Sequence, residues 1–236
     1  MCVGSINKGV SVGRMEYFAG TKCFINRAIF LSLLCYFVFF LALWRLLSPV
    51  IGEATNLSGM VYISGSSSVG SSDTDLEFYI DKYEVTQAEY FKVMRSSPSF
   101  FKGDNRPVEK VDWSQAFAYC KEVKKRLPTE MEWERAMRAG TTSPYYWGED
   151  QPDLYAWHKG NADKQTHNVG GKLPNSLGLY DMAGNVWEWT QTDHERSGKV
   201  VRGGSWRNGV QSLKSSHRIA SLVIHKFHYV GFRCAH

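Results

Sequence analysis

The sequence predicts an α+β fold with a small sheet, two to three helices and long loops. Short apolar runs typical of strands open the folded part of the chain, and helix-start signals follow them. From Thr141 onward the chain is rich in Gly, Pro, Asn and Trp, which indicates long loops. Hydrophobic residues make up 43% and charged residues 22%, as in ordinary globular proteins, and the eight Trp suit a loop-rich fold held by large side chains.

The first 58 residues divide into a leader, an apolar segment and a linker. Residues 1–27 are polar and basic, and residues 48–58 have the composition of a linker. Residues 28–47 are the predicted transmembrane or signal segment, because residues 28–44 carry no charge and would span roughly 25 Å as a helix. The domain after it is therefore expected to be exported, by a signal anchor, a cleaved signal peptide or lipidation at Cys35.

Two strands are expected at the start of the folded part, which begins at residue 59. Met60–Ile63 is a short β-like run, and residues 77–85 form a second one. The Ser- and Gly-rich residues 64–72 between them predict a turn or a loop.

Three helices are predicted from their N-terminal signals. Thr86 with Glu89, and Thr129 with Glu132, match the capping box, in which each side chain bonds the other residue's backbone N–H. A third start lies at Asp112 or two residues later, and the apolar residues that follow recur on one helical face. The helices are expected over residues 86–95, 112–126 and 129–139.

A strand with oxygen-bearing side chains is predicted around residues 185–189. Trp187 and Trp189 alternate and should share one face of the strand. Asn185 and Glu188, with the backbone of Val186, bring together the hard oxygen ligands that suit Ca²⁺. These residues therefore hold either a structural calcium ion or hydrogen bonds to neighbouring loops, and no other cofactor is expected.

The five cysteines do not match a metal or redox motif. No two of them have Cys-x-x-Cys spacing, which argues against a zinc or thioredoxin-type site. Cys120 and Cys234 lie in the folded part and could pair in an exported domain, but their spacing alone leaves this open.

The last part of the chain, residues 200–236, has an unusual composition. It contains no Asp or Glu, and it is bounded by Arg-Gly-Gly-Ser-Trp at residues 202–206 and by Gly-Phe-Arg-Cys-Ala at residues 231–235. Residues 207–229 follow neither a strand nor a helix period, which indicates irregular backbone between two anchors. This stretch is either irregular core or an exposed binding surface. The net charge of +5 is modest and no nucleic-acid reading module is present, so nucleic acid is not an expected partner.

Seven motifs stand in order along the folded part, at residues 78–86, 107–113, 126–134, 146–148, 178–189, 202–206 and 231–235. Together they resemble the formylglycine-generating-enzyme (sulfatase-modifying factor) family over about residues 59–236. The resemblance implies a C-type-lectin-type fold with a mixed, mostly antiparallel sheet. Enzymes of this family carry a Cys-His-x-x-Tyr-Cys segment whose thiolates bind copper, but residues 207–218 contain no Cys. The family's oxidase activity is therefore not expected here.

Residues 202–233 also resemble the variable region of diversity-generating-retroelement proteins, which use the same fold. In those genes Asn codons are randomised at adenine, so some positions vary and the positions between them stay fixed. The chain fits this pattern, called here the frame, without a gap, and its fixed and randomisable positions are called slots. Leu213, Lys214, Ser215, Ser216, Arg218, Lys226 and residues 231–233 fill the fixed slots. The randomisable slots hold Arg207, Asn208, Gly209, Ser212, His217, Ile219, Ala220, Ser221, Leu222, Ile224, His225, Phe227, His228 and Tyr229.

The residue types in the randomisable slots agree with that frame. Changing the first two bases of an Asn codon cannot give Lys, Glu, Gln, Met or Trp, and none of these fills a slot. Gln211 departs from the frame if its position is also an Asn codon.

The two resemblances imply a binding protein that is exported to the bacterial envelope, tethered to the membrane and exposed at the surface. Its ligand would be a macromolecule, such as a protein on another cell or host, and Phe227 and Tyr229 would anchor the contact. Two alternatives are a divergent formylglycine-generating-type oxidase and a structural or regulatory envelope module without variability.

Overall fold

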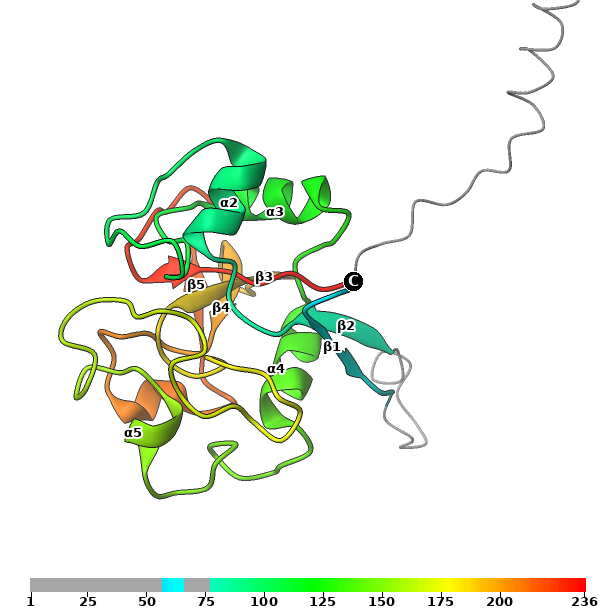
Figure 1. The fold of residues 1–236 in the computed structure, drawn as a ribbon. Helices are drawn as coiled ribbons and strands as arrows, with labels where there is room; N and C mark the ends of the chain where they lie inside the picture. Colours follow the sequence, from blue (N-terminus) through cyan, green and yellow to red (C-terminus); the bar gives the residue numbers. More distant parts are fainter. Residues whose placement is uncertain (1–56, 66–76) are drawn as a thin grey trace, which may run out of the picture. The chain divides into compact units, whose positions relative to one another are not determined.

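The computed structural model describes residues 57–65 and 77–236 (Figure 1). The predicted leader, the transmembrane or signal segment and all but the end of the predicted linker lie outside the described residues, as does most of the Ser- and Gly-rich stretch. Within residues 57–65 and 77–236, no helix has the length and apolar character needed to cross a bilayer.

Two small sheets form the β part of the domain. Strands β1 (Met60–Ile63) and β2 (Phe78–Asp81) pair antiparallel. The second sheet has the order β5-β4-β3-β6, and only the β3–β6 pair in it is parallel. The mixed, mostly antiparallel sheet was therefore predicted correctly. Its strands are β3 (Trp187–Asp193), β4 (Lys199–Arg202), β5 (Arg218–Ser221) and β6 (Val230–Gly231).

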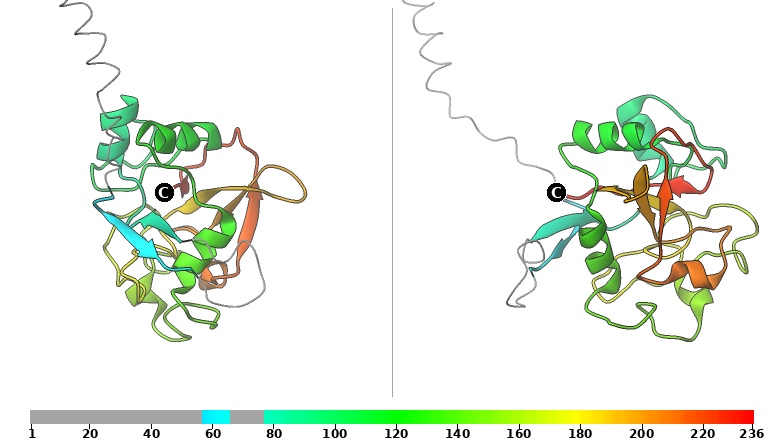
Figure 2. Two further views of the ribbon diagram at one scale, coloured as in Figure 1. Left: turned by 90° about the vertical axis from the view of Figure 1, so that its right-hand side faces the viewer. Right: turned by 180° about the vertical axis from the view of Figure 1, so that it is seen from behind.

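The three predicted helices are confirmed. Capping boxes open each of them, at Thr86, Asp112 and Thr129. Helices α2 and α3 lie on one side of the four-stranded sheet and α4 lies on the other, in all views of Figures 1 and 2. The helices are α2 (Gln87–Met94), α3 (Trp113–Glu122), α4 (Glu130–Arg138) and the short α5 (Pro152–Tyr155). The sequence did not predict α5, because four residues are too few to show a helical period.

The second strand is shorter than predicted and ends at Asp81. Beyond it the backbone still makes hydrogen bonds, since Val85 N–H donates to the Phe232 carbonyl and Val85 accepts from Val108 N–H. The predicted strand of residues 77–85 is therefore interrupted, because the chain bends at Lys82 and Tyr83 directly after the regular ladder.

The last residues of the chain tie the domain together. Residues 234–236 hydrogen-bond along β2, and Cys234 forms a disulfide with Cys120 of α3, which the sequence had left open. Trp187 and Trp189 belong to one apolar cluster, as their alternation predicted. Glu188 between them is also fully buried, so both faces of β3 are covered.

Candidate ligand-binding surface

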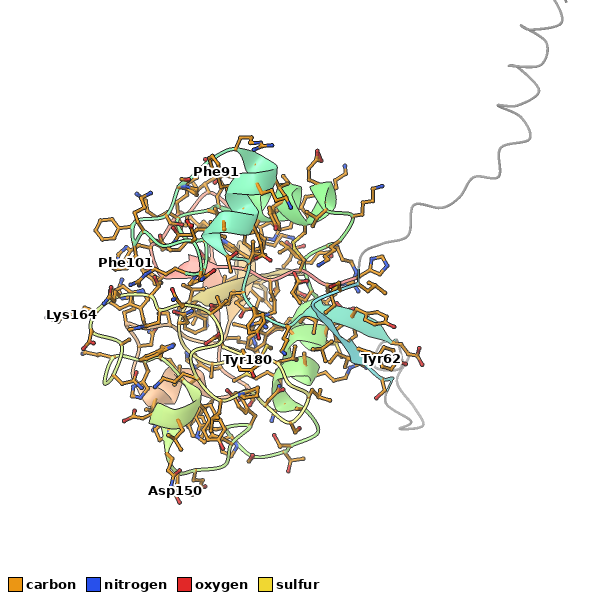
Figure 3. The ribbon with its side chains drawn as sticks, in the orientation of Figure 1. Tyr62, Phe91, Phe101, Asp150, Lys164 and Tyr180 are labelled. Carbon is orange, nitrogen blue, oxygen red and sulfur yellow. A yellow bond between two sulfur atoms is a disulfide. The ribbon has the colours of Figure 1, made fainter. Side chains whose placement is uncertain are left out.

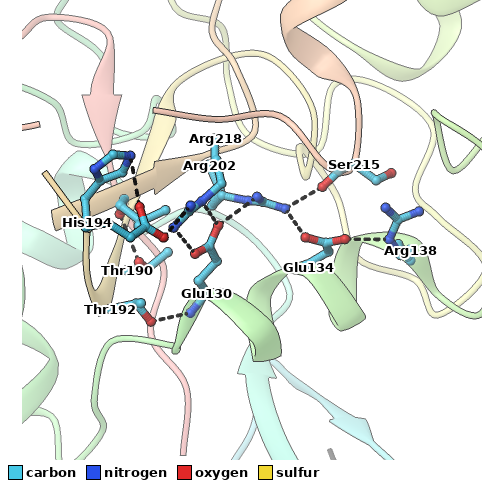
Figure 4. Close-up of polar contacts among 11 residues, drawn as sticks. Glu130, Glu134, Arg138, Thr190, Thr192, His194, Arg202, Ser215 and Arg218 are labelled. Carbon is cyan, nitrogen blue, oxygen red and sulfur yellow. Dashed lines mark hydrogen bonds and ion pairs between the residues drawn. The ribbon is translucent and has the colours of Figure 1, made fainter. Parts of the chain in front are cut away.

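The two ends of the C-terminal segment are anchored in the core by buried arginines. The Arg202 guanidinium, fully buried, donates to Glu130 Oε1 at 2.9 Å and to Glu134 Oε2 at 2.6 Å on α4 (Figure 4). Arg233, also fully buried, donates from Nε and Nη2 to the two Glu188 carboxylate oxygens, each at 2.8 Å. A buried bidentate pair of this kind holds one geometry, so both ends of the segment are rigid.

Gly204 shows why the first anchor contains glycine. Its φ of +78° is a conformation that side-chain-bearing residues rarely adopt. A Cβ at this position would also lie 2.7 Å from Cδ2 of Leu213 and 2.9 Å from the Ser212 carbonyl. A side chain at position 204 would therefore clash with Ser212 and Leu213.

Three of the predicted fixed slots are held in place by burial or by hydrogen bonds. The Leu213 side chain is fully buried, and the Ser215 carbonyl accepts a hydrogen bond from Arg202. Arg218 donates to Glu130 Oε1 and Oε2 at 2.7 and 2.8 Å (Figure 4). The segment is thus fastened to α4 at intervals along its length.

Part of the segment is regular, contrary to the prediction of irregular backbone. Val210–Leu213 forms the 3-10 helix η1, and β5 pairs antiparallel with β4 from Arg218 to Ser221. Each element is four residues long, and the strand residues Arg-Ile-Ala-Ser show no polar–apolar alternation. The pairing comes from β4 and not from a local sequence pattern.

Most of the predicted variable slots lie at the surface. Ile224 is the most exposed large apolar residue among those described, at 74%, and Leu222 is 44% exposed. Ser221 is the exception, because it is only 6% exposed and cannot reach a ligand. Exposed slots are Arg207, Gly209, Ala220, Leu222 and Ile224; half-buried slots are Asn208, Ser212, His217, Ile219, His225, Phe227, His228 and Tyr229.

The aromatic slots form a row across this surface. Phe227 and Tyr229 stack with ring centroids 4.9 Å apart and an interplanar angle of 9°. His225 lies 4.9 Å from Phe227 at one end, and the Arg207 guanidinium lies 4.5 Å above the Tyr229 ring at the other. We call these four residues the aromatic row. Its rings offer wide apolar contact at small entropic cost.

Two slot histidines are neutral at pH 7. Burial lowers the pKa of His228, and the cations Arg207 and Lys110 lower it further. Burial likewise lowers the pKa of His217, with Arg202 as the next contributor. Both rings therefore offer one donor and one acceptor rather than a positive charge.

Asn208 serves the scaffold as well as the surface. Its Oδ1 accepts hydrogen bonds from Trp187 Nε1 at 3.0 Å and from Ser205 Oγ at 2.6 Å. Because Trp187 belongs to β3 and Ser205 to the first anchor, replacing Asn208 by an apolar residue would leave two scaffold donors without this acceptor.

Comparison with known proteins places this chain in a family. Residues 52–236 match the model described as the sulfatase-modifying factor enzyme 1-like domain. The chain belongs to this family. Chaperone protein LppX of Paenibacillus barcinonensis is 31% identical to it, over 68% of this chain and 81% of that protein.

Other relatives of this sulfatase-modifying factor domain differ in kind. The inactive C-alpha-formylglycine-generating enzyme 2 of Mus musculus is 34% identical over 55% of this chain, which spans about half (48%) of that protein's length. Among solved structures, Treponema denticola variable protein 1 matches with a TM-score of 0.66 and 27% identity, over 75% of this chain and 94% of that one. The predicted α+β, C-type-lectin-type fold is confirmed.

The residues predicted as calcium ligands in this domain make hydrogen bonds to other protein groups. Both Glu188 oxygens accept hydrogen bonds from Arg233, whose charge offsets that of the carboxylate. The Asn185 amide and the Val186 N–H donate to Glu84, at 2.6 and 3.1 Å. Among the described residues, no group of three or more His, Cys, Asp or Glu could hold a metal ion. Glu188 and Asn185 thus make hydrogen bonds with neighbouring segments, and a structural calcium ion stays a prediction.

Glu84 and the pair Phe100–Phe101 are the residues that the sequence did not reveal. Glu84 is buried against Asn185, a hundred positions further along the chain, and no local pattern signals that contact. Phe100 and Phe101 lie in the loop after α2, with His228 5.7 and 6.0 Å from their rings. Two adjacent Phe in a loop were the available signal, because exposed aromatic pairs are uncommon away from binding surfaces.

One cavity of this domain measures about 340 Å³. Its lining includes Tyr83 after β2, Tyr119 of α3 and Lys125 after α3. No residue of the segment 207–229 lines it. The two cysteines of residues 57–65 and 77–236, Cys120 and Cys234, are joined to each other, so this part of the chain offers no free thiol.

Proposed function

We propose that this protein is a non-catalytic ligand-binding protein whose residues 207–229 vary between copies of the gene through a diversity-generating retroelement. One observation supports it above the others. Thirteen of the fourteen predicted slots are exposed or half-buried, while five of the nine fixed-slot residues, Leu213, Ser215 and 231–233, are buried. The other four fixed slots, Lys214, Ser216, Arg218 and Lys226, are half-buried or exposed. The likeness to Treponema denticola variable protein 1 agrees with it.

The division between slots and frame has a physical consequence. Substitutions of exposed residues away from caps and buried networks usually change stability by less than about 0.5 kcal/mol. Substitutions at a buried position such as Leu213 cost about 2 to 5 kcal/mol. A surface built in this way can change its side chains repeatedly without unfolding its scaffold.

The chemistry of the surface suits a macromolecular ligand, and a protein on another cell or host fits it best. The aromatic row supplies stiff apolar contacts, and the neutral His217 and His228 supply hydrogen bonds. Antibody loops combine aromatic anchors with adaptable polar groups in the same way. Affinity would arise from covering the row with a partner of complementary shape.

The non-catalytic part of the proposal rests on the cysteines. Residues 207–218, where the family's oxidases carry two copper-binding thiolates, contain none. Thiolates are the soft ligands that copper(I) selects, and no other side chain in this stretch replaces them. A divergent oxidase remains the second candidate, and copper analysis with a thiol-peptide oxidation assay distinguishes it.

The proposed location is the bacterial envelope, with the domain outside the cytoplasm and residues 28–47 as its tether or signal. The Cys120–Cys234 disulfide supports an exported domain, because such bonds persist in oxidising compartments and are rare in the cytosol. The tether itself rests on the sequence, since it lies outside the described residues.

One experiment with two arms tests the proposal. The gene is sequenced from many isolates, and differences should concentrate in the slot codons while Leu154 and Leu173, equally exposed outside the segment, stay constant. Intact cells are then treated with proteinase K, which should degrade the domain. Differences spread evenly over exposed positions would refute the variability, and a protected domain would refute the surface location.

A further inference from the structure

The aromatic row continues into a loop that the retroelement frame does not include. Phe100, 63% exposed, packs edge-on against Phe101 at 5.0 Å. Phe101 in turn packs edge-on against Trp206 at 5.5 Å, and both Phe rings face His228. The loop after α2 lies beside the C-terminal segment in Figures 1 and 2. We call Phe100, Phe101 and Trp206 the fixed aromatic corner.

The loop that carries this corner is held rigidly. Phe101 N–H donates to Glu109 Oε1 at 2.8 Å, and its carbonyl accepts from the Gln87 side chain of α2 at 2.7 Å. The Ser99 hydroxyl accepts from Glu109 N–H at 3.1 Å, and both Ser99 and Glu109 are buried. Phe100 is therefore exposed because the loop is fixed in that position, and it pays little entropy on binding.

The exposed charges of this loop and of the aromatic row are mostly positive, and Asp104 is the one exposed acid among residues 96–111. Lys110 is exposed and its N–H donates to the Phe227 carbonyl, which places it beside the aromatic row. Lys110 and Arg207 are the charged groups that act on His228. Lys102 is also exposed, and the segment after Glu195 carries no acid. A ligand that fills the corner would therefore gain from negative charge next to its apolar group.

We propose that the fixed aromatic corner is a constant half of the binding surface, which takes an aromatic or large aliphatic side chain flanked by Asp or Glu on a polypeptide ligand. The inference rests on the proposed function insofar as residues 207–229 bind a ligand. The variable slots would then choose among partners that share this one anchor. Such a division explains how a surface could retain affinity while most of its contacts change, because a few buried anchors dominate binding energy.

A polypeptide fits the corner better than a lipid bilayer does. The exposed Phe100 lies 5.7 Å from the ring of His228, which offers a donor and an acceptor, while the Trp206 N–H is already bonded to the His228 carbonyl at 3.2 Å. Alternating apolar and hydrogen-bonding groups match a peptide, which presents both along its length. A membrane-inserting tip would offer apolar side chains without such a polar rim.

The test uses a phage-displayed library of random twelve-residue peptides, panned on the immobilised full-length protein. Enriched peptides should share an aromatic or large aliphatic residue next to Asp or Glu. Synthetic copies should bind Phe100→Ser at least roughly tenfold more weakly than the natural protein. Phe91→Ser is the matched control, because Phe91 is 49% exposed and lies on α2 at the top of Figure 3, apart from Phe101. It should leave binding unchanged.

Several results would contradict the assignment of Phe100 to a peptide-binding surface. Peptides without the acidic–aromatic pattern, equal binding by Phe100→Ser, or a library that yields no specific peptide would each overturn it. So would binding of phosphatidylglycerol vesicles, or self-association, that Phe100→Ser abolishes, since these assign the corner to a lipid or to a second copy. Circular dichroism checks that both variants fold. The proposed function depends on the isolate comparison instead, so the two can fail separately.

Discussion

The buried carboxylate of Glu109 holds the loop after α2 and makes the stability of the domain depend on pH. Its Oε1 accepts from Phe101 N–H, while Oε2 is buried and has no hydrogen-bond partner among the described residues. Burial raises the pKa of Glu109 to about 7. In the folded protein its ionised form is thus disfavoured at neutral pH, although in the unfolded chain it titrates near its ordinary value of 4.5.

This gives a pH dependence of stability with a definite sign. Between pH 4.5 and about 7 the folded state binds more protons at Glu109 than the unfolded state, so stability falls as pH rises through this window and is level above it. Glu109→Gln should remove this contribution, which amounts to at most roughly 3 kcal/mol. Urea unfolding at pH 5 and pH 8 measures it as the difference between the two proteins, since burial also raises the pKa of Asp181 and Glu84 in both. Identical pH slopes would contradict it.

Helix α4 and strand β4 position the candidate surface through Arg202. This side chain joins Glu130 and Glu134 of α4 to the Ser215 carbonyl in the segment, and it is fully buried. Without Arg202 the Ser215 carbonyl loses its donor and a large buried side chain is missing, while Glu130 and Glu134 keep Arg218 and Arg138 as partners. Losing the fully buried member of such a network costs far more than breaking an exposed pair.

Arg202→Ala should therefore destabilise the domain by about 3 to 5 kcal/mol. Arg138→Ala is the control, because Arg138 pairs with the same Glu134 from a partly exposed position, where such a pair contributes about 0.5 kcal/mol or less. Urea denaturation of both variants gives the two values. Similar losses would show that α4 does not hold the segment through Arg202.

Local signals explain which elements the sequence could predict. The capping boxes at Thr86 and Thr129 act over three residues, so they are visible in the sequence and occur in the structure. Strand β5 depends on pairing with β4, and the contact of Glu188 with Arg233 joins positions 45 residues apart. Such contacts leave no local pattern. The resemblance to retroelement variable regions predicts the slots over the whole segment, yet it does not separate the buried Ser221 from the exposed Ala220 and Leu222.

At the scale of the molecule, contacts made by the C-terminal residues hold the domain together. The last residues pair along β2, the disulfide joins α3 to Cys234, and Gly231 passes between β3 and Val108. Between these fixed points the predicted slots are exposed or half-buried, apart from Ser221, and Ile219, Phe227 and Tyr229 pack against the core. Stability should therefore depend steeply on the frame and weakly on the slots.

A chain with four slots exchanged at once tests this division. Ala220→Ser, Leu222→Asn, Ile224→Asn and His225→Asn, all attainable from Asn codons, should together change the free energy of unfolding by about 1 kcal/mol or less, because the four positions are exposed or half-buried. Gly231→Ala alone should cost about 1 to 3 kcal/mol or more, since its Cβ would lie 2.4 Å from the Val108 carbonyl oxygen and backbone must move. Chemical denaturation compares the two. A four-slot chain that loses as much stability as Gly231→Ala would mean that the slots belong to the frame, and a surface of that kind could not vary freely.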